Sequence, residues 1–263
     1  DGGSVWSKIA LPSDVSGKDY HLNDIEVDPN NNKIWISSNY SRWGYYSGGN
    51  FYWSSDGANF TKITPSYPSN TNTNIFRVEF AASATTSDTF YVLLSTIFNF
   101  NSEAEIYKTV DGFSTLTKLN EPNDADTGIP STDFTRGQSF YDLEIEVDPN
   151  NEDIVYVGGI DLFRSVDGGT NWSQISKWSN NNNLAALPVS KVHADQHGIY
   201  FKPGDSDKGM VVNDGGVYYV SSLSSAATSS VFTAQESGFV TSQFYKVAQS
   251  PHDYATDMIL GGT

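Results

Sequence analysis

The chain of 263 residues contains no cysteine, and basic residues are scarce: 15 Lys and Arg stand against 31 Asp and Glu, for a formal net charge of −16. The absence of cysteine excludes disulfides, thiolate zinc sites and thiol catalysis. The acidic surplus argues against nucleic acid or an anionic membrane surface as a partner. No run approaches the roughly 18 apolar residues of a membrane-spanning helix, so we expect no membrane insertion.

Aromatic and small polar residues are, by contrast, abundant. Aromatic residues are 14% of the chain and charged residues only 17%, so Ser, Thr, Asn and Gly dominate the polar fraction. This composition favours strands and turns over surface helices. Helical periodicity is not convincing in any segment of ten or more residues, and the longest candidate is broken by Pro188. We therefore predict an all-β fold.

A short motif recurs four times along the chain. The copies are SVDGGTNWSQI from Ser165, SSDGANFTKI from Ser54, TVDGFSTLTKL from Thr109 and DGGSVWSKI from Asp1. The residues that define them are Asp1, Gly3, Trp6, Ser54, Asp56, Phe60, Thr109, Asp111, Ser165, Asp167, Gly169 and Trp172. Repetition at a spacing of roughly 50 residues is typical of propellers and solenoids.

A strand–turn–strand pattern precedes each motif, as in IEVDPNNNKIWISS from Ile25 and IEVDPNNEDIVYVGG from Ile145. Each repeat therefore reads as four strands, which is the content of one propeller blade. We predict one propeller segment over 1–263, with blades at 20–64, 74–120, 141–178 and 192–235 and a partial blade at 242–263. This division removes the alternative of two unrelated domains.

The repeated motif has the chemistry of a self-contained turn. The Asp167 carboxylate can accept hydrogen bonds from backbone N–H groups just downstream, and the Ser165 hydroxyl can add another. Gly168 and Gly169 permit positive φ. Trp172 opens the outer strand, where its ring can pack between neighbouring sheets. A calcium site is the alternative, but one carboxylate per turn supplies too few ligands.

The pattern Ser/Thr-x-Asp-x-Gly-x-x-Trp resembles the Asp-box, or BNR repeat, of sialidase-like and sortilin-like propellers. SVDGGTNW from Ser165 matches it fully, SSDGANF has lost one residue, and TVDGFSTL carries Phe113 and Leu116 in place of Gly and Trp. The resemblance implies a propeller with four-stranded antiparallel blades. In these families the boxes lie on the blade rim, away from the active face.

The segments VHADQHGIYFKPGDSDKGMVVNDGGVYY from Val192 and SQFYKVAQSPHDYATDMILGGT from Ser242 are similar to bacterial cell-surface proteins related to xyloglucan-degrading glycoside hydrolases. This resemblance implies a Bacteroidetes-type protein secreted by the type IX pathway to the outer cell surface. It also implies that both termini are cuts in a longer propeller. The alternative is a five-bladed ring in which residues 1–10 complete the unit from 242.

His193, Asp195 and His197 alternate, and on a strand this spacing directs the three side chains to one face. Two imidazoles and a carboxylate form a plausible transition-metal set, while a polar channel wall is the competing interpretation. An acid/base role for Asp195 is the third. We expect no other cofactor.

An aromatic segment suits ligand binding. Tyr40, Arg42, Trp43, Tyr45 and Tyr46 lie in a connection too long for a tight turn, and flat rings beside polar groups suit stacking on sugars or contact with a protein. Packing of this loop onto the propeller is the alternative. The following FYW sequence reads as a strand with core side chains.

A glycoside hydrolase needs two carboxylates about 5 to 10 Å apart across a cleft. Most aspartates fall at turn positions, and the remaining candidates are Asp24, Asp142, Glu144, Asp195 and Asp214. A sialidase needs several converging arginines, and the chain has only four. No G-x-S-x-G motif supports serine catalysis.

Three functions remain open from the sequence. We expect a non-catalytic recognition or adhesion module that binds a polysaccharide or a surface protein. The alternatives are part of a xyloglucanase-like glycoside hydrolase and an architectural spacer. Aromatic loops on one face favour the first function, a carboxylate pair across a groove the second, and short featureless loops the third.

Overall fold

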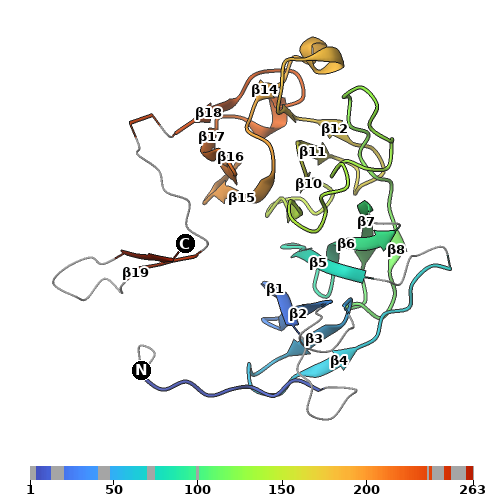
Figure 1. The fold of residues 1–263 in the computed structure, drawn as a ribbon. Helices are drawn as coiled ribbons and strands as arrows, with labels where there is room; N and C mark the ends of the chain where they lie inside the picture. The colour runs from blue at the N-terminus through green and yellow to red at the C-terminus, as the bar shows by residue number, and fades with distance from the viewer. Residues whose placement is uncertain are drawn as a thin grey trace.

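The computed structural model describes residues 4–12, 21–40, 48–69, 75–98, 101–235, 237–238, 246–249 and 259–262, and shows four sheets around a common centre (Figure 1). Each of these sheets has four strands in chain order, all antiparallel. This is the architecture of a partial β-propeller in which each sheet is one blade, so the predicted fold class is confirmed.

The strands of blade 1 are β1 (His21–Val27), β2 (Ile34–Asn39), β3 (Phe51–Ser54) and β4 (Thr61–Ile63). Blade 2 contains β5 (Ile75–Ala82), β6 (Phe90–Phe98), β7 (Asn101–Thr109) and β8 (Thr117–Lys118). Blade 3 contains β9 (Glu144–Val147), β10 (Val155–Gly158), β11 (Leu162–Ser165) and β12 (Ser173–Gln174). Blade 4 contains β15 (Gln196–Lys202), β16 (Asp205–Asn213), β17 (Gly216–Val220) and β18 (Phe232–Ala234).

Smaller elements complete the described part of the chain. A parallel pair, β13 (Ser176–Lys177) and β14 (Ser190–Lys191), flanks the 3-10 turn η1 (Asn182–Ala186), and η2 (Leu223–Ser225) lies in blade 4. The hairpin of β19 (Lys246–Gln249) and β20 (Ile259–Gly262) forms a separate two-stranded sheet. None of the helical turns in the described ranges approaches the length and apolarity that crossing a membrane would require.

The first strand of each blade lies innermost, because β1, β5, β9 and β15 contact one another in that order. Side chains alternate along these strands. In β5, Val78 and Phe80 are buried, whereas Arg77 and Glu79 are partly exposed. The apolar residues form separate clusters between blades 1 and 2, 2 and 3, and 3 and 4, so burial between sheets holds the blades together.

Blade 1 differs from the others on one face. Ile25 and Val27 are 62% and 52% exposed, although Val78 and Phe80, at the equivalent places in blade 2, are 0% and 1% exposed. In blade 2 these positions are covered by blade 1. No sheet within the described ranges covers blade 1 in the same way.

The repeated turns hold themselves together by the predicted hydrogen bonds. The Asp167 carboxylate accepts from the backbone N–H of Asn171 at 2.8 Å, and the Ser165 hydroxyl accepts from that of Gly169 at 2.9 Å. The backbone N–H of Asn59 donates to Asp56 at 2.8 Å, and that of Thr115 donates to Asp111 at 2.9 Å. The same lock therefore recurs in blades 1, 2 and 3.

Phe113 shows how the divergent turn of blade 2 is tolerated. It takes φ of 63° without being glycine, close to the φ of 85° at Gly169 in blade 3. Its ring is fully buried and stacks on Phe51 at 4.0 Å and on Phe90 at 4.7 Å between ring centroids. Aromatic burial thus offsets the backbone strain of a non-glycine residue in this region.

One local expectation fails, and the N-terminal copy of the motif differs from the others. Strand β15 begins only at Gln196, and Asp195 has φ of 64°, so the strand alternation assumed for His193, Asp195 and His197 does not apply. Trp6 is 88% exposed, and residues 4–12 contain no strand, so this copy of the motif does not pack its Trp between sheets. Asp1 and Gly3 lie outside the described residues.

Candidate functional site

Three groups of polar residues stand out, and the first runs along the inner strands. Asp24 in β1 accepts the backbone N–H of Phe80 in β5 at 2.8 Å, and Glu144 in β9 accepts that of Ile199 in β15 at 3.2 Å. Between these pairs, the Arg77 guanidinium of β5 donates to the carbonyl of Tyr141 at 2.7 Å. Side-chain hydrogen bonds therefore link β1 to β5, β5 to the segment that precedes β9, and β9 to β15.

We call Asp24, Glu26, Glu79, Glu144 and Glu146 the inner-strand cluster. Burial, with neighbouring carboxylates, raises the pKa of Asp24 to about 8 and that of Glu26 to about 7. Burial likewise raises the pKa of Glu146 to about 7 and that of Glu144 well above its usual range. Glu26 and Glu146 belong to blades 1 and 3 and still interact electrostatically, so they approach each other around the centre of the ring.

The second group lies at the face of the propeller where the inner strands begin, and we call Tyr141, Asp195, His197 and Asp214 the face cluster. Asp214 Oδ1 lies 2.8 Å from His197 Nε2 and accepts the Tyr141 hydroxyl at 2.9 Å. The Tyr141 ring meets the His197 ring edge to face at 5.0 Å. Burial and the nearby Asp214 carboxylate raise the pKa of Asp195.

The face cluster is assembled from separate blades and bordered by exposed rings. Tyr141 precedes β9, whereas His197 is in β15 and Asp214 lies between β16 and β17. Phe140 and Tyr141 are 54% and 38% exposed, and Arg77 from blade 2 bonds to both of their carbonyls. The arrangement can present aromatic surface, a carboxylate and an imidazole to one ligand.

Asp142 lies beside this group but inside the protein. It is fully buried, and neither carboxyl oxygen has a hydrogen-bond partner among the described residues. Burial raises its pKa to about 8, so at neutral pH the carboxyl is mostly protonated and uncharged. Having no exposed surface, it cannot itself touch a substrate in this conformation.

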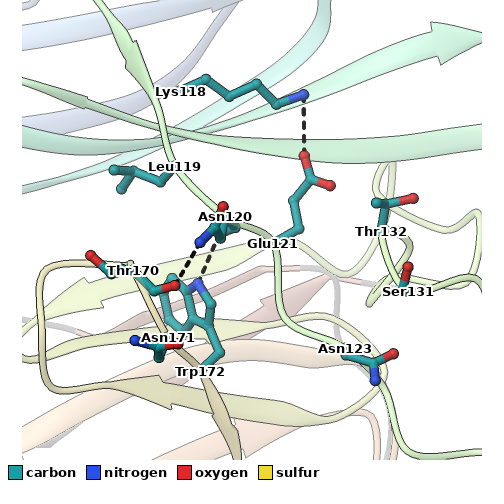
Figure 2. A pocket seen from close by; sticks show the side chains of 10 residues that line it. All are labelled: Lys118, Leu119, Asn120, Glu121, Asn123, Ser131, Thr132, Thr170, Asn171 and Trp172. Atoms are coloured by element: carbon teal, nitrogen blue, oxygen red, sulfur yellow. Dashed lines mark hydrogen bonds and ion pairs between the residues drawn. The ribbon is translucent and has the colours of Figure 1, made fainter.

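The third group lines a hollow of about 650 Å³ between blades 2 and 3, which we call the rim hollow (Figure 2). It is lined by Lys118 at the end of β8, by Leu119, Asn120, Glu121 and Asn123 after that strand, by Ser131 and Thr132, and by residues 170–172 before β12. The Trp172 indole N–H donates to the carbonyl of Asn120 at 2.8 Å, and the Asn120 amide donates to that of Thr170 at 2.7 Å. These two bonds join the walls of the hollow.

The predicted metal set is not supported. Within the described ranges, no group of three or more His, Asp and Glu side chains could hold a metal ion. His193 Nδ1 lies 3.1 Å from the carbonyl of Ala194, and its neighbours His197 and Asp195 belong to the face cluster through Asp214. The reason is the turn at Asp195, which breaks the strand alternation on which the prediction depended.

The aromatic loop can be described only at its first residue. Tyr40 donates its backbone N–H to Phe76 at 2.8 Å, and the two rings lie 6.0 Å apart, so the loop starts against β5. Arg42, Trp43, Tyr45 and Tyr46 lie outside the described residues. Phe51 and Tyr52 of the following strand are fully buried, as the sequence predicted.

Two features were missed from sequence. The rim hollow is lined in part by Glu121, Asn123, Ser131 and Thr132, which lie in the connection between blades 2 and 3, where no repeat marks them. Glu26, Glu79 and Glu146 were read as ordinary strand residues. Their common place one residue before Val27, Phe80 and Val147 was a usable signal, since equivalent inner-strand positions must approach one another in a ring.

Comparison with solved structures supports the fold. The chain is similar to the GH74 xyloglucanase from Xanthomonas campestris, with a TM-score of 0.53 and 15% identity over 89% of this chain and 32% of that protein. It thus spans about a third of that protein's length. YCF48 from Cyanidioschyzon merolae gives a TM-score of 0.48 and 11% identity, over 87% of this chain and 58% of that one.

The β-fructofuranosidase from Schwanniomyces occidentalis gives a TM-score of 0.44 and 14% identity, over 94% of this chain and 52% of that protein. No family model matches the sequence, and no curated protein matches it. At 15% identity, the likeness to the xyloglucanase structure shows a shared propeller fold and leaves the function to be argued from the site.

Proposed function

We propose that this propeller segment is a recognition module of a secreted or cell-surface bacterial protein, and that it binds glycan at the face cluster. The observation that carries the proposal is the convergence of exposed Phe140 and Tyr141 with His197 and Asp214 from another blade. Sugar rings have an apolar face that packs on aromatic rings and hydroxyls that bond carboxylate and imidazole groups. The Asp-box identity of the repeated turns is part of the same proposal.

The face cluster is held rigidly before any ligand arrives. Arg77 fixes the backbone of the Phe140–Tyr141 segment, and Asp214 fixes the Tyr141 hydroxyl. A ligand that meets a preorganised site loses less free energy to ordering of the protein. This rigidity is what a propeller scaffold supplies to a binding loop.

A glycan array with the wild-type chain and the Tyr141→Ala and Tyr141→Phe variants tests the proposal. Tyr141→Ala removes the ring and should weaken binding at least tenfold, whereas Tyr141→Phe keeps the ring and should cost less. Trp6→Ala is the matched control, because Trp6 is an exposed aromatic residue remote in sequence from the cluster. Equal binding by all four proteins, or no binding to any glycan, contradicts the proposal.

A glycoside hydrolase is the second candidate, and the inner-strand cluster favours it. Glu26 and Glu146 titrate at about 7, where a carboxyl group can act as a general acid or base at neutral pH. Release of reducing ends from polysaccharides, lost in Glu146→Gln, would support this function. Binding without any hydrolysis over a broad polysaccharide panel argues for the recognition module alone.

A further inference from the structure

We propose that the rim hollow is a second ligand site, separate from the face cluster, and that it binds an uncharged oligosaccharide. The hollow of about 650 Å³ has the size of ordinary small-molecule pockets, roughly 300–1,000 Å³. It lies at the outer strands β8 and β12, whereas the face cluster lies at the inner strands. A ligand can therefore occupy the rim hollow without contacting the face cluster.

The hollow offers polar groups that have no partner. The side chains of Asn123, Ser131 and Thr132 are exposed and make no hydrogen bond within the described ranges. Together they supply an amide that donates and accepts and two hydroxyls that do both. Figure 2 shows Ser131 and Thr132 on the opposite side of the hollow from Thr170 and Trp172. Such a set matches the alternating donors and acceptors of sugar hydroxyls.

An apolar surface completes the hollow. Trp172 is only partly buried and packs against the core between blades 2 and 3, and Leu119 also lines the hollow. The indole N–H is already bonded to Asn120, so the ring has a fixed orientation. A fixed aromatic ring beside free hydroxyl and amide groups is suited to the apolar face of a pyranose.

The charges near the hollow indicate a neutral ligand. Among the described residues, Lys118 is the only cation that lines it, and Lys118 is paired with Glu105 at 2.7 Å and Glu121 at 3.3 Å. Burial, together with nearby carboxylates, raises the pKa of Glu121 and of Glu103. The part of the chain that the structure describes places no unpaired cation in the hollow to attract an anion, and the chain carries a net charge of −16. A uronic-acid oligosaccharide or an acidic peptide is therefore disfavoured.

The walls are prearranged by contacts between blades. Besides the two bonds through Asn120, the Gly169 turn lies against Leu119, whose Cδ1 is 2.7 Å from where a Cβ of residue 169 would lie. Gly169 adopts a φ of 85°, which glycine takes without strain and which lets the turn approach Leu119 closely. Ligand binding would not have to order these walls, which preserves affinity.

Isothermal titration of the Tyr141→Ala variant tests the inference, because this background weakens binding at the face cluster and leaves the rim hollow intact. The ligands are cellohexaose, xylohexaose, mannohexaose and, as the charged arm, hexagalacturonate. We expect one of the neutral hexasaccharides to bind with a stoichiometry of about one. Adding Asn123→Ala and Thr132→Val should weaken that binding at least tenfold, because both polar partners are lost.

Asn183→Ala in the same background is the matched control, since Asn183 is an exposed asparagine in η1. Urea unfolding of each variant verifies that the exposed substitutions leave the fold intact. Absence of neutral binding in the Tyr141→Ala background, or equal binding after the rim substitutions, overturns the rim site. Preferred binding of hexagalacturonate also overturns it. If the wild-type chain binds a glycan and the Tyr141→Ala variant binds none, the rim site fails while the proposed function at the face cluster stands. The two failures are therefore distinguishable.

Discussion

Carboxylates in the turns and carboxylates on the inner strands of the same blades behave in opposite ways. In the turns, hydrogen bonds from Asn59 and Asn171 hold the pKa values of Asp56 and Asp167 below their usual range. On the inner strands, burial raises the pKa of Glu26 to about 7 and that of Asp24 to about 8. In the turns, hydrogen-bond donors stabilise the charged carboxylate. On the inner strands, burial away from water disfavours the charged form.

The acidic residues of this chain therefore fall into two structural classes. The turn aspartates are ionised groups that stabilise a local backbone shape. On the inner strands, burial raises the pKa of Asp24, Glu26, Glu144 and Glu146 and favours their protonated forms. Asp24 and Glu144 also serve as acceptors between blades. The net charge counted from sequence therefore overstates the charge that the folded protein carries near its centre.

The largest expected effect is on the pH dependence of stability. A carboxyl whose folded pKa is raised stabilises the fold fully below its usual pKa near 4, and that contribution is lost as pH rises through 7 to 8. Between about pH 4 and pH 8 we expect the free energy of unfolding to fall by on the order of 5 kcal/mol. Urea unfolding from pH 4 to pH 9 measures it, and a flat profile would contradict the raised values.

The double variant Glu26→Gln with Glu146→Gln should sharpen the comparison. It removes two groups that ionise at about 7, so it should stabilise the protein by about 2 kcal/mol at pH 8 relative to wild type. At pH 5 both groups are protonated in the wild type, so the difference there should be small. An equal effect at both pH values would mean that packing, and not ionisation, is responsible.

Breaking one turn lock should have a smaller, pH-independent effect. Ser165→Ala removes the buried hydroxyl that accepts the N–H of Gly169 and should cost about 1 to 2 kcal/mol between pH 5 and pH 8. Ser131→Ala, at an exposed serine without a hydrogen bond, is the control and should cost almost nothing. A pH-dependent loss in Ser165→Ala would show that the turn is coupled to the inner strands.

Removing a turn charge should have the smallest effect, confined to acid. Hydrogen bonds from Asn171 hold the pKa of Asp167 low, so the stability that its ionisation supplies is present above about 4 and is lost below it. Asp167→Asn should lower the urea midpoint slightly at pH 7 and leave it closer to wild type at pH 3. Asp56→Asn should act in the same direction, and a gain of stability at pH 7 in either variant would contradict the assignment.

Repetition made the blades predictable, because each repeat carries its own strand alternation and its own turn residues. The hydrogen bonds of Asp167 and Ser165 were expected from their spacing alone, since both partners lie within four residues. The face cluster could be predicted only in part. Asp195, His197 and Asp214 were candidates, but Tyr141 is 56 residues before His197 and no local pattern connects them.

What the sequence determined by itself is therefore local: the all-β class, the blade period and the turn locks, all set by contacts between residues close in the chain. What only the tertiary structure decided is which blades face each other and which side chains they bring together. The backbone turn at Asp195 abolished the expected metal set, and closure of blade 2 on blade 3 created the rim hollow around Trp172. The burial that raises the pKa of Asp24, Glu26, Glu144 and Glu146 exists only after the inner strands assemble, because single strands leave those groups in water.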